Sequence, residues 1–153
     1  MLRAVLAVVL AVALLGVSLP ALDEARVKRT DVRVGSELEG LADEMRLLQR
    51  GDAAVPSGTP GARVATTFSV PHRSWAAAGV EFVSLSTTDG GRARFGWRAD
   101  GGRRHVQRVP DVRLSVAGPS DSLVLTTGGR HRLHLRLVRT DSERVVVVAR
   151  PDV

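Results

Sequence analysis

Apolar and polar positions divide the chain into three zones with different periods. The first zone is an apolar run from Ala4 to Leu22, in which Ser18 is the only polar side chain. As a helix, this run would extend about 28 Å, which nearly matches a hydrocarbon core of about 30 Å. Because the run has no polar face, a helix buried in a soluble domain is disfavoured. We therefore expect residues 1–22 to form a transmembrane anchor or a signal-like segment.

A cleaved signal peptide is the alternative to a retained anchor. Arg3 supplies a short positive stub, but the apolar run is slightly long for a signal peptide and no A-x-A triplet follows it. The best site of this kind lies after Ser18, which would leave Leu19 as the first residue. We favour retention as a single-pass anchor in the cell membrane, with secretion after cleavage as the alternative.

Two arguments about the side of the membrane oppose each other. Arg3 precedes the run, and four cations follow it, namely Arg26, Lys28, Arg29 and Arg33. The positive-inside rule would place the rest of the chain in the cytoplasm. A short N-terminal tail before a single apolar segment is, in contrast, typical of an exported protein. We expect the C-terminal part on the extracellular side.

The second zone, residues 23–50, has the period of an amphipathic helix. Its apolar positions alternate in steps of four and three, at Val34, Leu38, Leu41, Met45 and Leu48. Two heptads are too few for a coiled coil, so we expect this helix to pack on the following domain. Ser36 is a candidate N-cap, and the glycines on either side, Gly35 and Gly40, favour a break there. Residues 51–62 are rich in Pro and Gly and predict a linker.

The third zone, residues 63–153, has a period of two. In RARFGWR, Ala93, Phe95 and Trp97 alternate with arginines, and RHRLHLRL repeats this pattern. Such alternation predicts strands with one buried and one wet face. Val145–Val148 is apolar at every position, which predicts a central strand covered on both faces.

Glycine-rich turns separate the predicted strands. Asp89-Gly90-Gly91, Asp100-Gly101-Gly102 and Gly128-Gly129 predict hairpins, since glycine supplies the positive φ of primed turns. Up to eight strands follow, near 63–70, 79–87, 92–98, 103–109, 112–117, 122–127, 130–139 and 143–149. The predicted class is α+β, with two N-terminal helical segments followed by an antiparallel β-sheet or small β-sandwich.

Composition and charge narrow the chemistry. The chain has no cysteine, which excludes disulfides and thiolate metal sites. Residues 60–153 hold 15 arginines against 8 acidic residues, a net charge of +7. Only Lys28 is lysine, a bias typical of a GC-rich genome, so part of this charge reflects codon usage.

No catalytic signature is present. The histidines His72, His105, His131 and His134 do not show metal-ligand spacing. Neither a G-x-S-x-G elbow nor a phosphate-binding loop occurs. We expect no enzyme activity, no metal, no cofactor and no small-molecule substrate.

Arginines on the predicted wet faces form the one candidate binding surface. They are Arg92, Arg94, Arg98, Arg130, Arg132 and Arg136. If neighbouring in the sheet, they could hold an acidic protein or polyanion; the alternative is a solvated face. Phe95 and Trp97 face away from them, which disfavours nucleic acid. We expect Trp75 to pack against the sheet, with an exposed position in a loop as the alternative.

The order of these zones resembles type IV pilins and pseudopilins: a basic stub, an apolar helix, an amphipathic continuation, a linker and a β domain. Arg3-Ala4 before the apolar run resembles a prepilin-peptidase site, which would cut between Ala4 and Val5. The fifth mature residue, a glutamate in most pilins, would be Val9. The chain also resembles an uncharacterised haloarchaeal family of short membrane-anchored proteins that accompanies pilus-like and type II secretion-type systems.

These resemblances imply a structural or accessory component of a pilus-like or secretion assembly. The expected partners are membrane lipid, through residues 4–22, and other proteins of a membrane assembly. The alternative is an exported binding module that holds an acidic protein or polyanion on its arginine-rich face.

Overall fold

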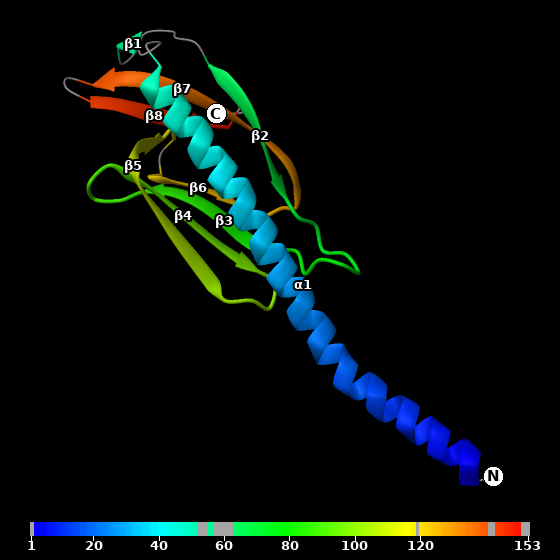
Figure 1. The fold of residues 1–153 in the computed structure, drawn as a ribbon. Coiled ribbons are helices and arrows are strands. Elements are labelled where there is room, and N and C mark those ends of the chain that lie inside the picture. The colour runs from blue at the N-terminus through cyan, green and yellow to red at the C-terminus, as the bar shows by residue number, and fades with distance from the viewer. Residues whose placement is uncertain (1, 52–54, 57–62, 119, 141–142, 151–153) are drawn as a thin grey trace.

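The computed structural model describes residues 2–51, 55–56, 63–118, 120–140 and 143–150. In these ranges one helix precedes eight strands: α1 Leu2–Arg50, β1 Val55–Pro56, β2 Val64–Val70, β3 Val80–Thr87, β4 Arg92–Ala99, β5 Arg104–Val116, β6 Ser122–Leu125, β7 Gly129–Thr140 and β8 Glu143–Ala149. Figure 1 shows the C-terminal half of α1 lying across the strands, while its N-terminal half extends away from them. The predicted α+β class is confirmed.

Helix α1 joins the two predicted helical segments without a break. It runs through Pro20, although proline in a helix interior removes one backbone hydrogen bond. It also continues through Gly35 and Gly40, so the prediction of a break and of an N-cap at Ser36 is wrong. Gly35 faces the ring of Trp97, to which an added Cβ would come within 3.7 Å. Close packing on the sheet thus holds the helix where its propensity is weak.

The strands form one mixed sheet in the order β1-β7-β8-β5-β4-β3-β6, and β2 also pairs with β7. The β1–β7 and β5–β8 pairs are parallel, and the other pairs are antiparallel. The prediction of a wholly antiparallel sheet is therefore corrected. Hairpins account for local pairs such as β3–β4, whereas the parallel pairs join segments that are distant along the chain.

Strand β5 connects two halves of this sheet. It pairs with β4 up to Val109 and again at Arg113, and from Leu114 onward it pairs with β8. Pro110 lies between these stretches and has no N–H to donate, and the register with β4 shifts at this point. The two strands predicted at 103–109 and 112–117 are therefore one bent strand. We call β3, β4, β6 and the start of β5 the β4 half, and β1, β2, β7, β8 and the end of β5 the β8 half.

One hydrophobic core lies between α1 and the sheet. The predicted stripe of α1 lines it: Val34, Leu38, Leu41 and Met45 are buried, and Leu48 is packed against the same cluster. The sheet contributes residues from both halves, among them Phe95 and Leu135. Helix α1 contacts β2, β4, β5, β7 and β8. Both halves of the bent sheet thus pack against the same helix.

Polar contacts fasten α1 to the sheet at several levels. Near its C-terminus, the Arg144 guanidinium donates to the carbonyl oxygens of Gln49 and Gly51, at 3.2 and 3.1 Å. The Gln49 side chain donates back to the Arg144 carbonyl oxygen at 3.1 Å. A cation at these carbonyls also complements the helix dipole.

Two of the three predicted hairpin turns are present. Gly91 and Gly101 have φ values of 70° and 73°, in the turns that join β3 to β4 and β4 to β5. Gly128-Gly129 does not form a hairpin, because β6 pairs with β3 whereas β7 pairs with β2 and β8. This segment instead carries the chain from the β4 half to the β8 half.

The predicted linker at 51–62 lies mostly outside the described residues. Its described part includes β1, where Val55 and Pro56 pair with Val138 and Arg139 of β7. Strand β8 is central, between β7 and β5, as the Val145–Val148 run predicts. Its odd positions, however, are half-exposed, so the strand is covered on one face and not on both.

Candidate functional site

The N-terminal half of α1 is an exposed apolar surface. Among the described residues, it holds one window long and apolar enough to cross a membrane, and none of that window is buried. A helix belonging to the core of a soluble domain is therefore excluded by position. The Ser18 hydroxyl donates to the Leu14 carbonyl oxygen at 2.8 Å, so the one polar side chain in the run has a partner within the helix. A polar group in hydrocarbon needs a hydrogen-bond partner within the protein, because no water is available there.

The candidate cleavage residues Ala4 and Val5 lie in the first turns of this helix and are exposed. A peptidase that acts in the membrane would meet no part of the β domain there, because the sheet contacts begin beyond Leu22. Cleavage between these two residues stays a prediction.

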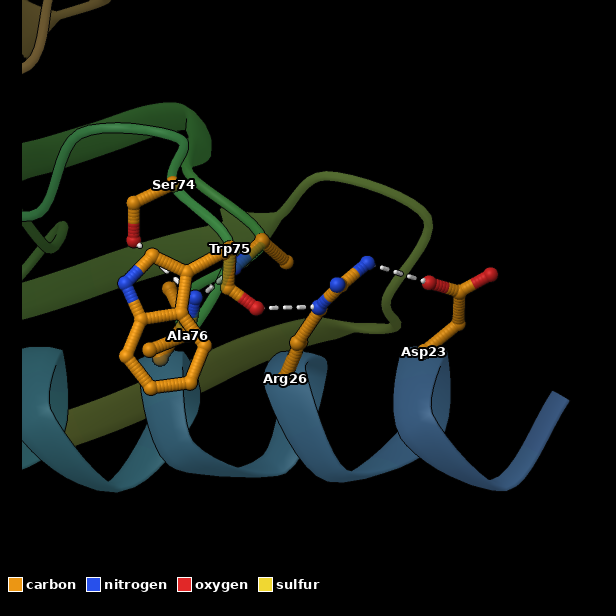
Figure 2. Close-up of polar contacts among 7 residues, drawn as sticks. Asp23, Arg26, Ser74, Trp75 and Ala76 are labelled. Carbon is orange, nitrogen blue, oxygen red and sulfur yellow. Dashed lines mark hydrogen bonds and ion pairs between the residues drawn. The ribbon is translucent and has the colours of Figure 1, made fainter. Parts of the chain in front are cut away.

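The β domain meets α1 closest to the apolar run at the loop that joins β2 to β3. Arg26 Nε donates to the Trp75 carbonyl oxygen at 2.6 Å, and Arg26 also forms an ion pair with Asp23 at 3.0 Å. Figure 2 shows these contacts, with the Trp75 ring projecting from the loop beside the helix. The Trp75 side chain is 85% exposed, so the prediction that it packs against the sheet is wrong.

The six predicted arginines do not form one surface. Arg92, Arg94 and Arg98 lie on β4, whereas Arg130, Arg132 and Arg136 lie on β7. Strands β5 and β8 separate β4 from β7 in the sheet, and the bend of β5 divides the two groups further. All six side chains are on solvent-facing positions, as the alternation predicts. The grouping fails because alternation assigns a face but not a neighbouring strand.

A different arginine cluster forms on the outer face of the β4 half. Arg94 lies directly opposite Arg108, and Arg98 lies directly opposite Arg104. We call these four residues the β4–β5 arginine cluster. Like charges at directly opposed positions repel each other, which favours an anion between them. Arg104 and Arg108 were missed, although the glycine turn at Gly101 sets this register.

A shallow groove of about 300 Å³ runs beside this cluster. Phe82, Val106 and Val124 supply apolar surface to it, and Arg94 and Arg104 lie at its edges. Gly96 also lines the groove, and an added Cβ there would come within 2.8 Å of Ser84 Oγ. The face therefore combines exposed apolar groups with cations.

The cluster is partly held by contacts within the domain. Arg94 Nε donates to Ser86 Oγ at 3.2 Å, and Arg98 forms an ion pair with Glu81 at 3.2 Å. The Arg104 guanidinium lies over the Phe82 ring, 5.7 Å from its centroid. These contacts orient the guanidinium groups and leave them exposed.

The histidines are dispersed over the domain. His105 pairs with Asp31 of α1 at 3.1 Å and stacks on Trp97, with ring centroids 5.0 Å apart. His131 is hydrogen-bonded to the Thr127 carbonyl oxygen at 2.8 Å. Across the described ranges, no group of three or more His, Asp or Glu could hold a metal ion.

Among the residues that the structure describes, the ion pair with a marked effect on ionisation joins α1 to the bend of β5. Arg46 Nε and Nη2 contact the two carboxylate oxygens of Asp111, at 2.6 and 3.3 Å. The hydrogen bonds from Arg46 lower the pKa of Asp111, and those from Asp111 and Asp43 raise the pKa of Arg46. This geometry indicates a structural role, because the Arg46 guanidinium and the Asp111 carboxylate are hydrogen-bonded to each other.

Comparisons with known proteins identify the family and leave its activity open. Searches of curated proteins and of solved structures gave no significant match. The profile of a domain of unknown function, DUF7311, matches residues 1–151. This match extends over both the exposed apolar helix and the β domain, and the chain therefore belongs to the DUF7311 family.

Proposed function

We propose that this protein is a membrane-anchored, non-enzymatic component of a pilus-like or secretion assembly, in a structural or accessory role. The apolar half of α1 would cross the membrane once, and the β domain would lie on the extracellular side. The domain would act through protein contacts and not through chemistry on a substrate.

The observation that carries this proposal is the division of one helix into two environments. The large apolar side chains that the structure describes between Leu2 and Leu22 are exposed, and the stripe from Val34 to Met45 is buried against the sheet. Leaving so many apolar side chains in water is unfavourable, at about 25 cal/mol per Å² of apolar surface. A bilayer, or the packed helices of an assembly, would remove this cost.

The resemblance to pilins gives this arrangement a context. In that family the apolar helix anchors the subunit before assembly and later packs in the filament core. Val9 stands where most pilins carry a glutamate, so anchoring or capping fits this chain better than self-polymerisation. In the secretion context an accessory subunit needs the same anchor and a folded domain at the membrane surface.

Membrane fractionation with N-terminal sequencing tests the anchor and its processing. We expect the protein in the membrane pellet, released by detergent and not by high salt, with Val5 as its first residue. A soluble protein that begins at Leu19 would instead be a secreted module. An intact chain that stays in the supernatant without detergent would contradict the proposal.

The side of the membrane can be tested with one engineered thiol. The chain has no cysteine, so Asp89→Cys, in the exposed β3–β4 turn, creates a unique site. A membrane-impermeant maleimide should label this variant in intact cells. Labelling only after lysis would place the β domain in the cytoplasm.

A second candidate function is the capture of an acidic protein on the β4–β5 arginine cluster. The opposed pairs Arg94–Arg108 and Arg98–Arg104 support it, since they concentrate positive charge beside an apolar groove. Arg108→Glu should abolish binding of poly-glutamate, measured by calorimetry. The same change places a carboxylate opposite Arg94, so stability should rise by about 0.5 kcal/mol. Arg132→Glu, on β7, is the matched control and should leave binding intact; equal losses in both variants would refute a specific site.

A further inference from the structure

The β2–β3 loop presents an apolar tip at the level where α1 leaves its apolar run. Residues 74–80 carry no charged side chain, and three alanines follow Trp75 at the tip. Trp75 is 85% exposed there, the highest exposure of any large apolar side chain described. A bulky indole on an uncharged loop tip is expensive to leave in water.

Two hydrogen bonds hold this loop at a defined height on the helix. Arg26 Nε donates to the Trp75 carbonyl oxygen at 2.6 Å (Figure 2), and the Ala78 N–H donates to Thr30 Oγ1 at 3.1 Å. Thr30 is buried, with 1% exposure. The loop is closed on itself by a bond from Ser74 N–H to the Ala77 carbonyl oxygen at 2.9 Å. Trp75 thus lies on a short turn that is fixed to α1 on both sides.

The height of this turn can be compared with the membrane boundary. Arg26 lies four residues beyond Leu22, which corresponds to about 6 Å along the helix axis. The headgroup and interfacial layer adds about 5–7 Å to each side of the hydrocarbon core. If the apolar run fills the hydrocarbon core, the Trp75 backbone therefore lies within or at the edge of this layer.

We propose that Trp75 is an interfacial anchor, and that the tip of the β2–β3 loop at Trp75 rests in the headgroup layer of the membrane that α1 crosses. This inference rests on the proposed membrane anchor and adds a second contact to it. Indole rings are enriched at this depth, because their apolar body and N–H suit a layer that is partly wet. Arg73 and Arg103 line the cleft between the loop and α1, and acidic residues such as Asp23 and Asp100 line it as well, so the charge beside the tip is mixed.

The ring lies alongside α1, on the side of Arg26 away from Asp23 (Figure 2). An exposed side chain changes rotamer within nanoseconds, so the ring can turn toward the bilayer without movement of the backbone. On the side of the loop, these hydrogen bonds use backbone atoms and the Ser74 hydroxyl, and none of them involves the indole.

The chain has two tryptophans, which makes the test direct. Trp97→Phe leaves Trp75 as the only reporter, and Trp75→Phe leaves the buried Trp97. Each full-length variant is reconstituted into phosphatidylcholine vesicles with and without bromine on the upper acyl chain. Bromolipid should quench Trp75 and shift its emission to the blue, and should leave Trp97 emission unchanged. Emission from Trp75 that stays unquenched by bromolipid and open to acrylamide would overturn the inference.

Flotation of the same vesicles separates the two proposals. Protein that floats with lipid while Trp75 stays unquenched retains the anchor and refutes the loop contact. Protein that does not float refutes the anchor itself. A blue shift that appears only at high protein-to-lipid ratio, without quenching, would assign Trp75 to a second copy of the chain and also overturn the inference.

A second pair of variants tests the same contact without the Trp97→Phe substitution, so the result does not depend on whether that variant folds. Ala76→Cys carries a spin label at the loop tip. Asp89→Cys carries one in the β3–β4 turn. The other end of β4 leads to the turn at Asp100, which lines the cleft with α1. Both tryptophans are kept. The label at residue 76 should be accessible to oxygen dissolved in lipid, and that at residue 89 to a water-soluble nickel chelate. Equal access of the nickel chelate to both labels would contradict the proposal.

Discussion

Replacement of Leu38 by alanine would test whether the second half of α1 belongs to the β domain. The Leu38 side chain is fully buried between the helix and the sheet, whereas Leu47, nine residues later in the same helix, is 66% exposed. Leu38→Ala removes buried carbon and leaves a cavity, at a cost of about 3 kcal/mol. Leu47→Ala makes the same chemical change with an effect within about 0.5 kcal/mol.

Urea unfolding in mild detergent measures this difference. Trp97 is a suitable reporter, because its ring lies against Gly35 of α1, and Trp75→Phe removes the other tryptophan from the signal. With a urea m-value of about 2 kcal/mol/M, the midpoint should fall by about 1.5 M for Leu38→Ala. The midpoint of Leu47→Ala should stay near that of the parent. Equal midpoints for both variants would show that the helix does not dock on the sheet, and would refute the packing argument.

Three further predictions concern the contacts around the helix. Thr30→Val should cost about 1–3 kcal/mol and speed hydrogen exchange at the Ala78 amide, since that donor loses its acceptor. Asp111→Asn should lower stability at neutral pH; because Arg46 lowers the pKa of Asp111 in the folded state, the difference from the parent should disappear as pH falls below the usual value of 3.8. Gly79→Ala should cost more than about 1 kcal/mol in thermal unfolding, since φ is 84° and the Cβ would meet a neighbouring side chain at 2.7 Å.

Controls for these variants come from the same regions. Gly90→Ala has open space and no positive φ, so it should be near neutral. Asp121→Asn changes an exposed side chain, so its stability should stay within about 0.5 kcal/mol of that of the parent. Thr127→Val, on an exposed site, should not change exchange at Ala78.

Local periodicity predicted the elements because it reports which side of each element is buried. The step of four and three from Val34 to Met45 identified the buried face of α1, and the alternation around Phe95 identified that of β4. These patterns record burial of side chains on one face, which is a local property of a helix or strand.

Pairing between distant strands could not be predicted in the same way. The parallel contact of Leu114 with Val146 joins two segments with β6 and β7 between them, and no local pattern encodes it. The arginine set was grouped wrongly for this reason. The pair Arg94–Arg108 is different, because a hairpin centred on the glycine turn sets its register, so it was within reach of the sequence.

The position of Trp75 depended on a contact that composition does not reveal. Its exposure follows from the bonds of its loop to Arg26 and Thr30, which hold the tip on the helix and away from the sheet. In the sequence, Thr30 looks like any other polar position of the helix. Its burial is explained only by the β2–β3 loop, whose Ala78 N–H donates to the Thr30 hydroxyl.

Helix α1 is continuous from the exposed apolar end to the β domain, so the orientations of these two parts are coupled. Because one continuous helix joins the exposed apolar end to the contact of Arg144 with Gln49, a tilt at one end is passed toward the other, and Pro20 marks the position where the helix lacks a backbone hydrogen bond. The angle at which neighbouring helices cross would therefore dictate how the domains face one another. Conversely, a force on the domain would reach the exposed apolar end through the helix itself.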